Sequence, residues 1–183
     1  AVRAADPAYA LRRQLAKTPM PKPNADGRYI LIALGKAAPQ MLQEALGHVR
    51  SRSTSLAVTH YENSFAPPRM RILRAGHPVP DENGFAASQE VMALLASAKA
   101  EDQVIVLISG GGSALLPAPA KGITLSDKVT VNELLLESGL DIVRVNLVRQ
   151  QLSDLKGGGM LRLASPAPVT SYVLSDVIGD DLR

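Results

Sequence analysis

A loop of three consecutive glycines flanked by two serines lies at 109–113 of the 183-residue chain. It follows an apolar run at 104–108 that is typical of a buried strand. Glycines allow positive φ and close backbone approach, so successive amides of such a loop can converge on an anion. A tight strand-to-helix turn is the alternative. We favour anion binding by the five residues of the loop, which are Ser109, Gly110, Gly111, Gly112 and Ser113.

Neither standard phosphate-binding pattern fits the sequence. The dinucleotide pattern GxGxxG fails because its third glycine would fall at Leu115. The Walker pattern GxxxxGK[ST] fails because Ile30 takes the place of its first glycine and Ala37 that of its hydroxyl. Lys36 nevertheless stands where a predicted strand meets a helix, from which its ammonium can reach a ligand. A solvated surface lysine is the alternative.

A helical segment at 144–156 carries two stripes with the same spacing. The apolar stripe consists of Val145, Val148, Leu152 and Leu155. The polar stripe consists of Asn146, Arg149, Ser153 and Lys156. The polar stripe contains no acid, which suits an anionic ligand or partner, whereas an ordinary solvated face is the alternative.

Two further segments carry groups that can take part in chemistry. Asp176 and Asp180 lie in an acidic turn after the last predicted strand, where carboxylates can bind Mg²⁺ or act as a base. Helix capping and solvation are the alternative for each of them. His77 has no second His or Cys at a metal-ligand spacing, so we expect it either to contact a substrate or to shape its turn.

Apolar runs alternate with amphipathic segments along the chain. We expect strands at 29–34, 55–59, 70–74, 104–108 and 169–174. We expect helices at 3–16, 37–50, 85–99, 126–138 and 141–155. This alternation predicts an α/β protein with a Rossmann-like three-layer α/β/α architecture and a mostly parallel sheet. Ligands bind at the carboxyl ends of the strands in such folds, which is where Lys36, the 109–113 loop and the acidic turn fall.

The composition excludes several classes of protein. Hydrophobic residues make up 46% and charged residues 20% of the chain, which supports a packed core. No apolar run reaches the ~18 residues of a membrane helix, and there is no cysteine for disulfides or thiolate metal sites. The N-terminal half is basic, but aromatic residues make up only 3%, which disfavours nucleic-acid binding. We expect a cytoplasmic protein with no nucleic-acid or membrane partner.

Four stretches taken together resemble one known family. They are GHPVPDENG at 76–84, LISGGGSALL at 107–116, NLVRQQLSDLKGG at 146–158 and VLSDVIGDD at 173–181. In this order and spacing they resemble the N-terminal domain of glycerate 2-kinases, whose second domain is called MOFRL and some of whose members were named hydroxypyruvate reductases. We therefore interpret 1–28 as an N-terminal helix with a Pro-rich loop and 29–183 as the Rossmann-like domain. We expect the chain to be a fragment that lacks the second domain.

The resemblance implies ATP-dependent phosphorylation of D-glycerate to 2-phosphoglycerate with Mg²⁺. Lys36, in the sequence GKAA, would be catalytic together with Asp176, and Asp176 and Asp180 would hold the metal. The 109–113 loop would bind phosphate or substrate, and Arg149 and Lys156 would be cations of the cleft. From their own positions in the sequence, we add His77 and Asn146 to the expected binding residues. The C-terminal domain of the same protein is an implied partner, and a homodimer is compatible with the resemblance. The chain departs from many members at KGGGML, where an arginine usually follows two glycines.

Two other functions stay open from the sequence. One is an NAD(P)H-dependent hydroxypyruvate reductase, against which the missing GxGxxG pattern counts. The other is a non-catalytic module that binds a phosphorylated sugar, with the glycine loop as its anion site. Consumption of ATP that depends on glycerate distinguishes the kinase from both.

Overall fold

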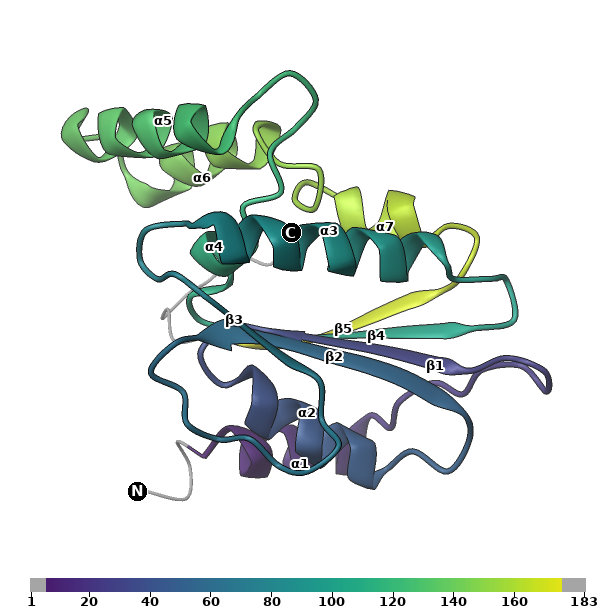
Figure 1. Cartoon of the computed structure of the whole chain (residues 1–183). Helices are drawn as coiled ribbons and strands as arrows, with labels where there is room; N and C mark the ends of the chain where they lie inside the picture. Colours follow the sequence, from purple (N-terminus) through teal and green to yellow (C-terminus); the bar gives the residue numbers. More distant parts are fainter. Residues whose placement is uncertain (1–5, 176–183) are drawn as a thin grey trace.

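Five parallel strands form the centre of the molecule in the computed structural model, which describes residues 6–175 (Figure 1). The strands are β1 (Tyr29–Leu34), β2 (Ser53–His60), β3 (Ile72–Ala75), β4 (Gln103–Ser109) and β5 (Val169–Leu174). They are hydrogen-bonded in the order β3-β2-β1-β4-β5, and every pairing is parallel. The predicted α/β class with a parallel sheet is confirmed.

Helices cover both faces of this sheet, which explains the apolar runs in its central strands. On one face lie α1 (Pro7–Lys17) and α2 (Ala38–Gly47), and on the other lie α3 (Glu82–Ala96) and α7 (Gly159–Ala164) (Figure 1). All six residues of β1 are buried. Successive side chains of β1 point to opposite faces, so Ile32 packs with the α3 side and Leu31 with the α2 side.

A pair of helices stands out from the layer of α3 and α7 (Figure 1). We call α5 (Leu125–Glu137) and α6 (Ile142–Gln151) the α5–α6 hairpin. A capping box between Thr124 and Asp127 begins α5, and the Asp141 side chain accepts a hydrogen bond from the Arg144 amide at the start of α6. The short helix α4 (Gly112–Leu115) connects β4 to this part of the chain.

The helix expected to continue to residue 155 or 156 ends at Gln151. Beyond it the backbone pairs with the segment before α5: Ala120 donates to the Leu152 carbonyl at 3.2 Å, and Asp154 donates to the Ala118 carbonyl at 3.0 Å. These tertiary hydrogen bonds replace those of a continuing helix, so Ser153 and Lys156 lie beyond the end of α6. The prediction that both lie on this helix is wrong.

The apolar stripe predicted for this segment is therefore correct only in part. Val145 and Leu155 are buried, as expected. Val148 is 39% exposed, which contradicts its assignment to the core. The reason is that α6 belongs to a projecting hairpin rather than to a helix packed along its length against the sheet.

Candidate functional site

The candidate site lies at the point where the connections from β1 and β4 leave the sheet on opposite faces. These neighbouring strands lead to α2 on one face and, through α4, to α7 on the other. Such a switch in direction opens a crevice at the carboxyl ends of the two strands, which is the usual ligand site of this architecture. Lys36 follows β1 and the 110–113 loop follows β4, so the sheet brings both predicted features to this crevice.

Ser109 joins the two strand ends. Its buried hydroxyl donates to the Leu34 carbonyl at 3.3 Å and accepts a hydrogen bond from the Ala37 amide at 3.0 Å. A side chain at Gly35, where φ is +113°, would place its Cβ 2.3 Å from the same hydroxyl. The Lys36 amide also donates to the Gly110 carbonyl at 2.8 Å. Ser109 and Gly110 thus position the turn that carries Lys36.

Gly111 is the place where three strand ends meet. Its φ is +88°, and an added Cβ would lie 3.1 Å from the His77 ring and 3.2 Å from the Lys36 Cγ. His77 follows β3 and Lys36 follows β1, so residues that follow two other strands lie against this glycine, which itself follows β4. The third glycine has a different role: a Cβ at Gly112 would lie 2.4 Å from the Leu34 Cδ1, so Gly112 allows α4 to pack closely on β1.

The surroundings of His77 favour the neutral form of its imidazole. Burial lowers the pKa of its imidazole, and the nearby positive charge of Lys36 lowers it further. A lower pKa means that more of the imidazole is neutral near pH 7 than in an exposed histidine, which already carries a small fraction of charge there. A neutral ring has a nitrogen that is free to accept a proton.

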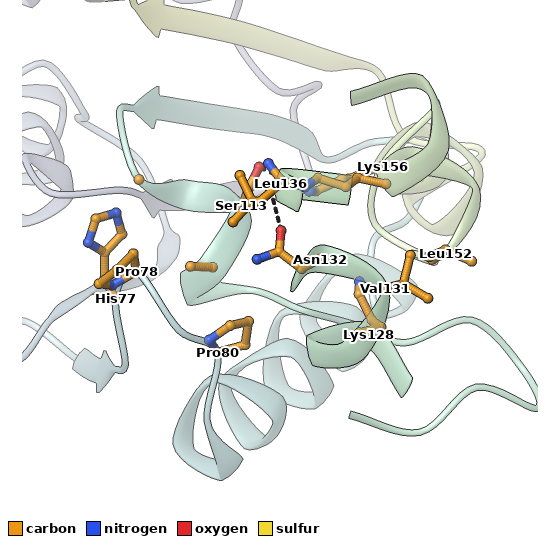
Figure 2. Close-up of a pocket in the computed structure, with 13 residues that line it drawn as sticks. His77, Pro78, Pro80, Ser113, Lys128, Val131, Asn132, Leu136, Leu152 and Lys156 are labelled. Carbon is orange, nitrogen blue, oxygen red and sulfur yellow. Dashed lines mark hydrogen bonds between the residues drawn. The ribbon is translucent and has the colours of Figure 1, made fainter. Parts of the chain in front are cut away.

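A pocket of about 300 Å³ lies between His77 and the α5–α6 hairpin (Figure 2). Lys128 of α5, Arg149 of α6 and Lys156 all line it. The Lys156 Nζ donates to the Ser113 Oγ at 2.9 Å. We call these residues the cation pocket.

Burial changes the acidity of both lysines in the cation pocket. Burial first, and then the charge of Lys156, lower the pKa of Lys128 to about 8. Burial first, and then the charge of Arg149, lower the pKa of Lys156 to about 8. Two partly buried lysines beside an arginine repel one another, and an anion in the pocket would relieve that repulsion.

A second, more open pocket of about 770 Å³ is lined by Lys36. Gln40, His60 and Glu62 contribute to its lining. Buried Asn63 fixes its inner wall, since the Asn63 amide donates to the Lys36 carbonyl at 2.8 Å and its side-chain oxygen accepts from the Phe65 amide at 2.9 Å. Lys36 thus lines the open pocket, and its Cγ would lie 3.2 Å from a Cβ on Gly111, which lines the cation pocket.

Some predicted site residues do not join this arrangement. Asn146 is exposed on α6 and lines neither pocket. Asp176 and Asp180 lie outside the described residues. Within 6–175, no group of three or more His, Asp or Glu side chains is arranged to hold a metal ion. In the same range, every helix is too short or too polar to cross a bilayer.

Three residues at the site were missed from the sequence: Asn63, Lys128 and Asn132. Asn132 accepts a hydrogen bond from the Arg149 guanidinium and lies between the histidine and lysine sides of the cation pocket (Figure 2). Lys128 and Asn132 are four residues apart on one helix, and this spacing is the only sign of their proximity in the sequence. Many solvated helix faces have polar residues at the same spacing.

The whole chain, residues 1–183, matches the family model described as "Domain of unknown function (DUF4147)". The chain belongs to this family. A "D-glycerate 2-kinase" from Thermotoga maritima is 41% identical over 170 residues, which cover 91% of this chain and 40% of that protein. A "Putative hydroxypyruvate reductase" from Agrobacterium vitis is 45% identical over 157 residues, covering 85% of this chain and 40% of the relative.

The crystal structure of a glycerate kinase from Thermotoga maritima has the same fold. It superposes with a TM-score of 0.88 at 37% sequence identity, over 99% of this chain and 43% of that one. The predicted membership of the glycerate 2-kinase family is thus confirmed, and the α/β architecture with it. The chain spans about 40% of the length of these curated relatives.

Proposed function

We propose that the complete protein is an ATP-dependent kinase that phosphorylates D-glycerate to 2-phosphoglycerate. The observation that carries this proposal is the meeting of Lys36, His77 and Gly111 at three strand ends, where Gly111 and His77 line one pocket and Lys36 lines another. A phosphoryl transfer needs two ligands whose reacting ends meet beside a cation. The names of the relatives from Thermotoga maritima agree with this chemistry.

Lys36 and neutral His77 have separate roles in such a reaction. The Lys36 ammonium stabilises negative charge on the phosphoryl group as it moves. His77 accepts the proton of the attacking glycerate hydroxyl, whose oxygen bonds to the terminal phosphorus of ATP while ADP leaves. Gly111 leaves room for the reacting groups because it has no side chain between Lys36 and His77.

Mg²⁺ would supply charge neutralisation on the phosphates when bound. The described residues provide no cluster that fits the metal. Asp176 and Asp180 therefore stay its proposed ligands, with Asp176 also proposed as catalytic. The second domain, a homodimer and a cytoplasmic location likewise stay proposals.

The test is ADP formation by the complete protein with and without D-glycerate. Lys36→Ala should lower kcat by about 10²-fold or more, because the charge on the moving phosphoryl group loses its counter-charge. Lys22→Ala is the matched control, since Lys22 is exposed in the loop before β1. Near-normal turnover in a folded Lys36→Ala protein would contradict the assignment of Lys36.

A reductase is the second candidate, because the relative from Agrobacterium vitis carries that name. Oxidation of NADH or NADPH that depends on hydroxypyruvate, together with no ADP formation from ATP and glycerate, would replace the kinase proposal with this one.

A further inference from the structure

Three cations converge on the cation pocket from separate parts of the chain. Lys128 comes from α5, Arg149 from α6, and Lys156 from the turns that precede α7. No Asp or Glu of the described residues lines the same pocket. Asp154 acts on Lys128 through its charge but is not part of the lining. The lining of the pocket therefore carries an excess of positive charge, which no carboxylate of the lining neutralises.

Each cation has a protein partner, but all of these partners are uncharged. Lys128 donates to the Pro117 carbonyl, Arg149 to the Asn132 side chain, and Lys156 to the Ser113 hydroxyl. These contacts orient the three side chains and leave their charge uncompensated.

Arg149 has one buried donor that is unused. The Arg149 Nε is buried and has no hydrogen-bond partner among the described residues. An unsatisfied buried donor is costly, and more so when it carries charge. A ligand oxygen that approached Arg149 would recover this cost.

The number of positive charges in the cation pocket favours a phosphate chain over a carboxylate as its ligand. Glycerate brings a single negative charge, whereas a triphosphate brings several that are close together and many acceptor oxygens. Part of the pocket wall is apolar, formed by Pro78, Val131 and Leu136, and low polarity beside a charge strengthens its attraction to an opposite charge.

The pocket also leads to the catalytic lysine. Gly111 lines it, and a Cβ on Gly111 would lie 3.2 Å from the Lys36 Cγ. A chain of phosphates that begins among the three cations can thus extend toward Gly111 and His77, which line the same pocket next to Lys36. The open pocket that Lys36 lines is left for the acceptor.

We propose that the cation pocket binds the phosphate chain of ATP, and that Lys128 of α5 is a binding residue beside Arg149 and Lys156. The assignment to ATP rests on the proposed kinase function. It makes the α5–α6 hairpin part of the nucleotide site, although the hairpin lies outside the layers that cover the sheet.

The direct test is calorimetric titration of the complete protein with sodium tripolyphosphate. Lys128→Gln should weaken tripolyphosphate binding by about tenfold, because a charge-assisted hydrogen bond is lost. Lys121→Gln is the matched control: it removes the same charge from the exposed loop before α5 and should leave affinity unchanged within about twofold. Lys128→Arg, which keeps the charge, should retain most of the affinity and guards against a folding defect.

Kinetics then separates the two substrates. Lys128→Gln should raise the KM for ATP by about tenfold and leave the KM for glycerate within about twofold. Equal tripolyphosphate affinity in wild type and Lys128→Gln would overturn the proposal. So would a rise in the KM for glycerate alone, which would assign the pocket to the acid. If the wild-type protein forms no ADP with glycerate, the kinase function fails, and the titration still decides whether the pocket binds phosphate chains.

Discussion

At the scale of single residues, neighbouring members of the glycine loop have unlike roles. Ser109 joins the ends of β1 and β4, and Gly112 allows α4 to pack closely on β1, while Gly111 and Ser113 line the cation pocket. The sequence predicts the loop as a whole because three adjacent glycines are conspicuous. It does not separate these roles, because each depends on Leu34, Lys36 or His77, which are distant in the chain.

Gly111→Val tests the position that carries the site. The added side chain would be strained at a φ of +88° and would collide with His77 and Lys36, so we expect tripolyphosphate binding and turnover to fall by at least tenfold. Gly122→Val is the matched control, since its φ is +85° and no atom lies within 4 Å of the added Cβ. Calorimetry and ADP release measure both variants. Unchanged binding in Gly111→Val would make the loop a turn and nothing more.

At the scale of elements, local patterns predict the strands better than the helix ends. The central strands stand out in the sequence because they are buried on both faces. The end of α6 does not stand out in the sequence. Leu152 and Asp154 are hydrogen-bonded to the segment from Ala118 to Ala120, and no local pattern encodes these bonds. Lys128 was missed for a related reason: only the placement of the α5–α6 hairpin brings it near Arg149 and Lys156.

The exposed position of α6 gives a stability prediction within one helix. Val145 is 3% exposed and Val148 is 39% exposed. Val145→Ala should lower the free energy of unfolding by roughly 1–2.5 kcal/mol through lost burial and a cavity, and Val148→Ala by less than about 0.5 kcal/mol. Denaturant unfolding, with hydrogen exchange of the α6 amides as the probe, measures the difference between the two losses. Equal losses for the two variants would show that α6 is packed along its whole length, as the sequence suggests.

At the scale of the whole molecule, positive charges lie close together at the carboxyl edge of the sheet, and their repulsion lowers the stability of the folded protein. Lys128 and Lys156 have a pKa of about 8 in the folded protein, below the ordinary value of 10.5. The unfolded chain therefore binds more protons than the folded chain between about pH 8 and pH 10.5. It follows from proton linkage that these two lysines make folding more favourable as the pH rises through this window. Binding of an anion requires the opposite, because it needs the lysines charged.

Stability and anion binding should consequently change in opposite directions between pH 7.5 and 9.5. Relative to a Lys128→Gln/Lys156→Gln variant, the wild-type melting temperature should rise over this range in the absence of anion. The rise in melting temperature that tripolyphosphate produces in the wild type should shrink over the same range, because the lysines lose their protons. A Lys128→Arg/Lys156→Arg variant stays charged and should show neither change. Tripolyphosphate stabilisation that is equally large at pH 9.5 in the wild type would mean that the two lysines do not bind the phosphates.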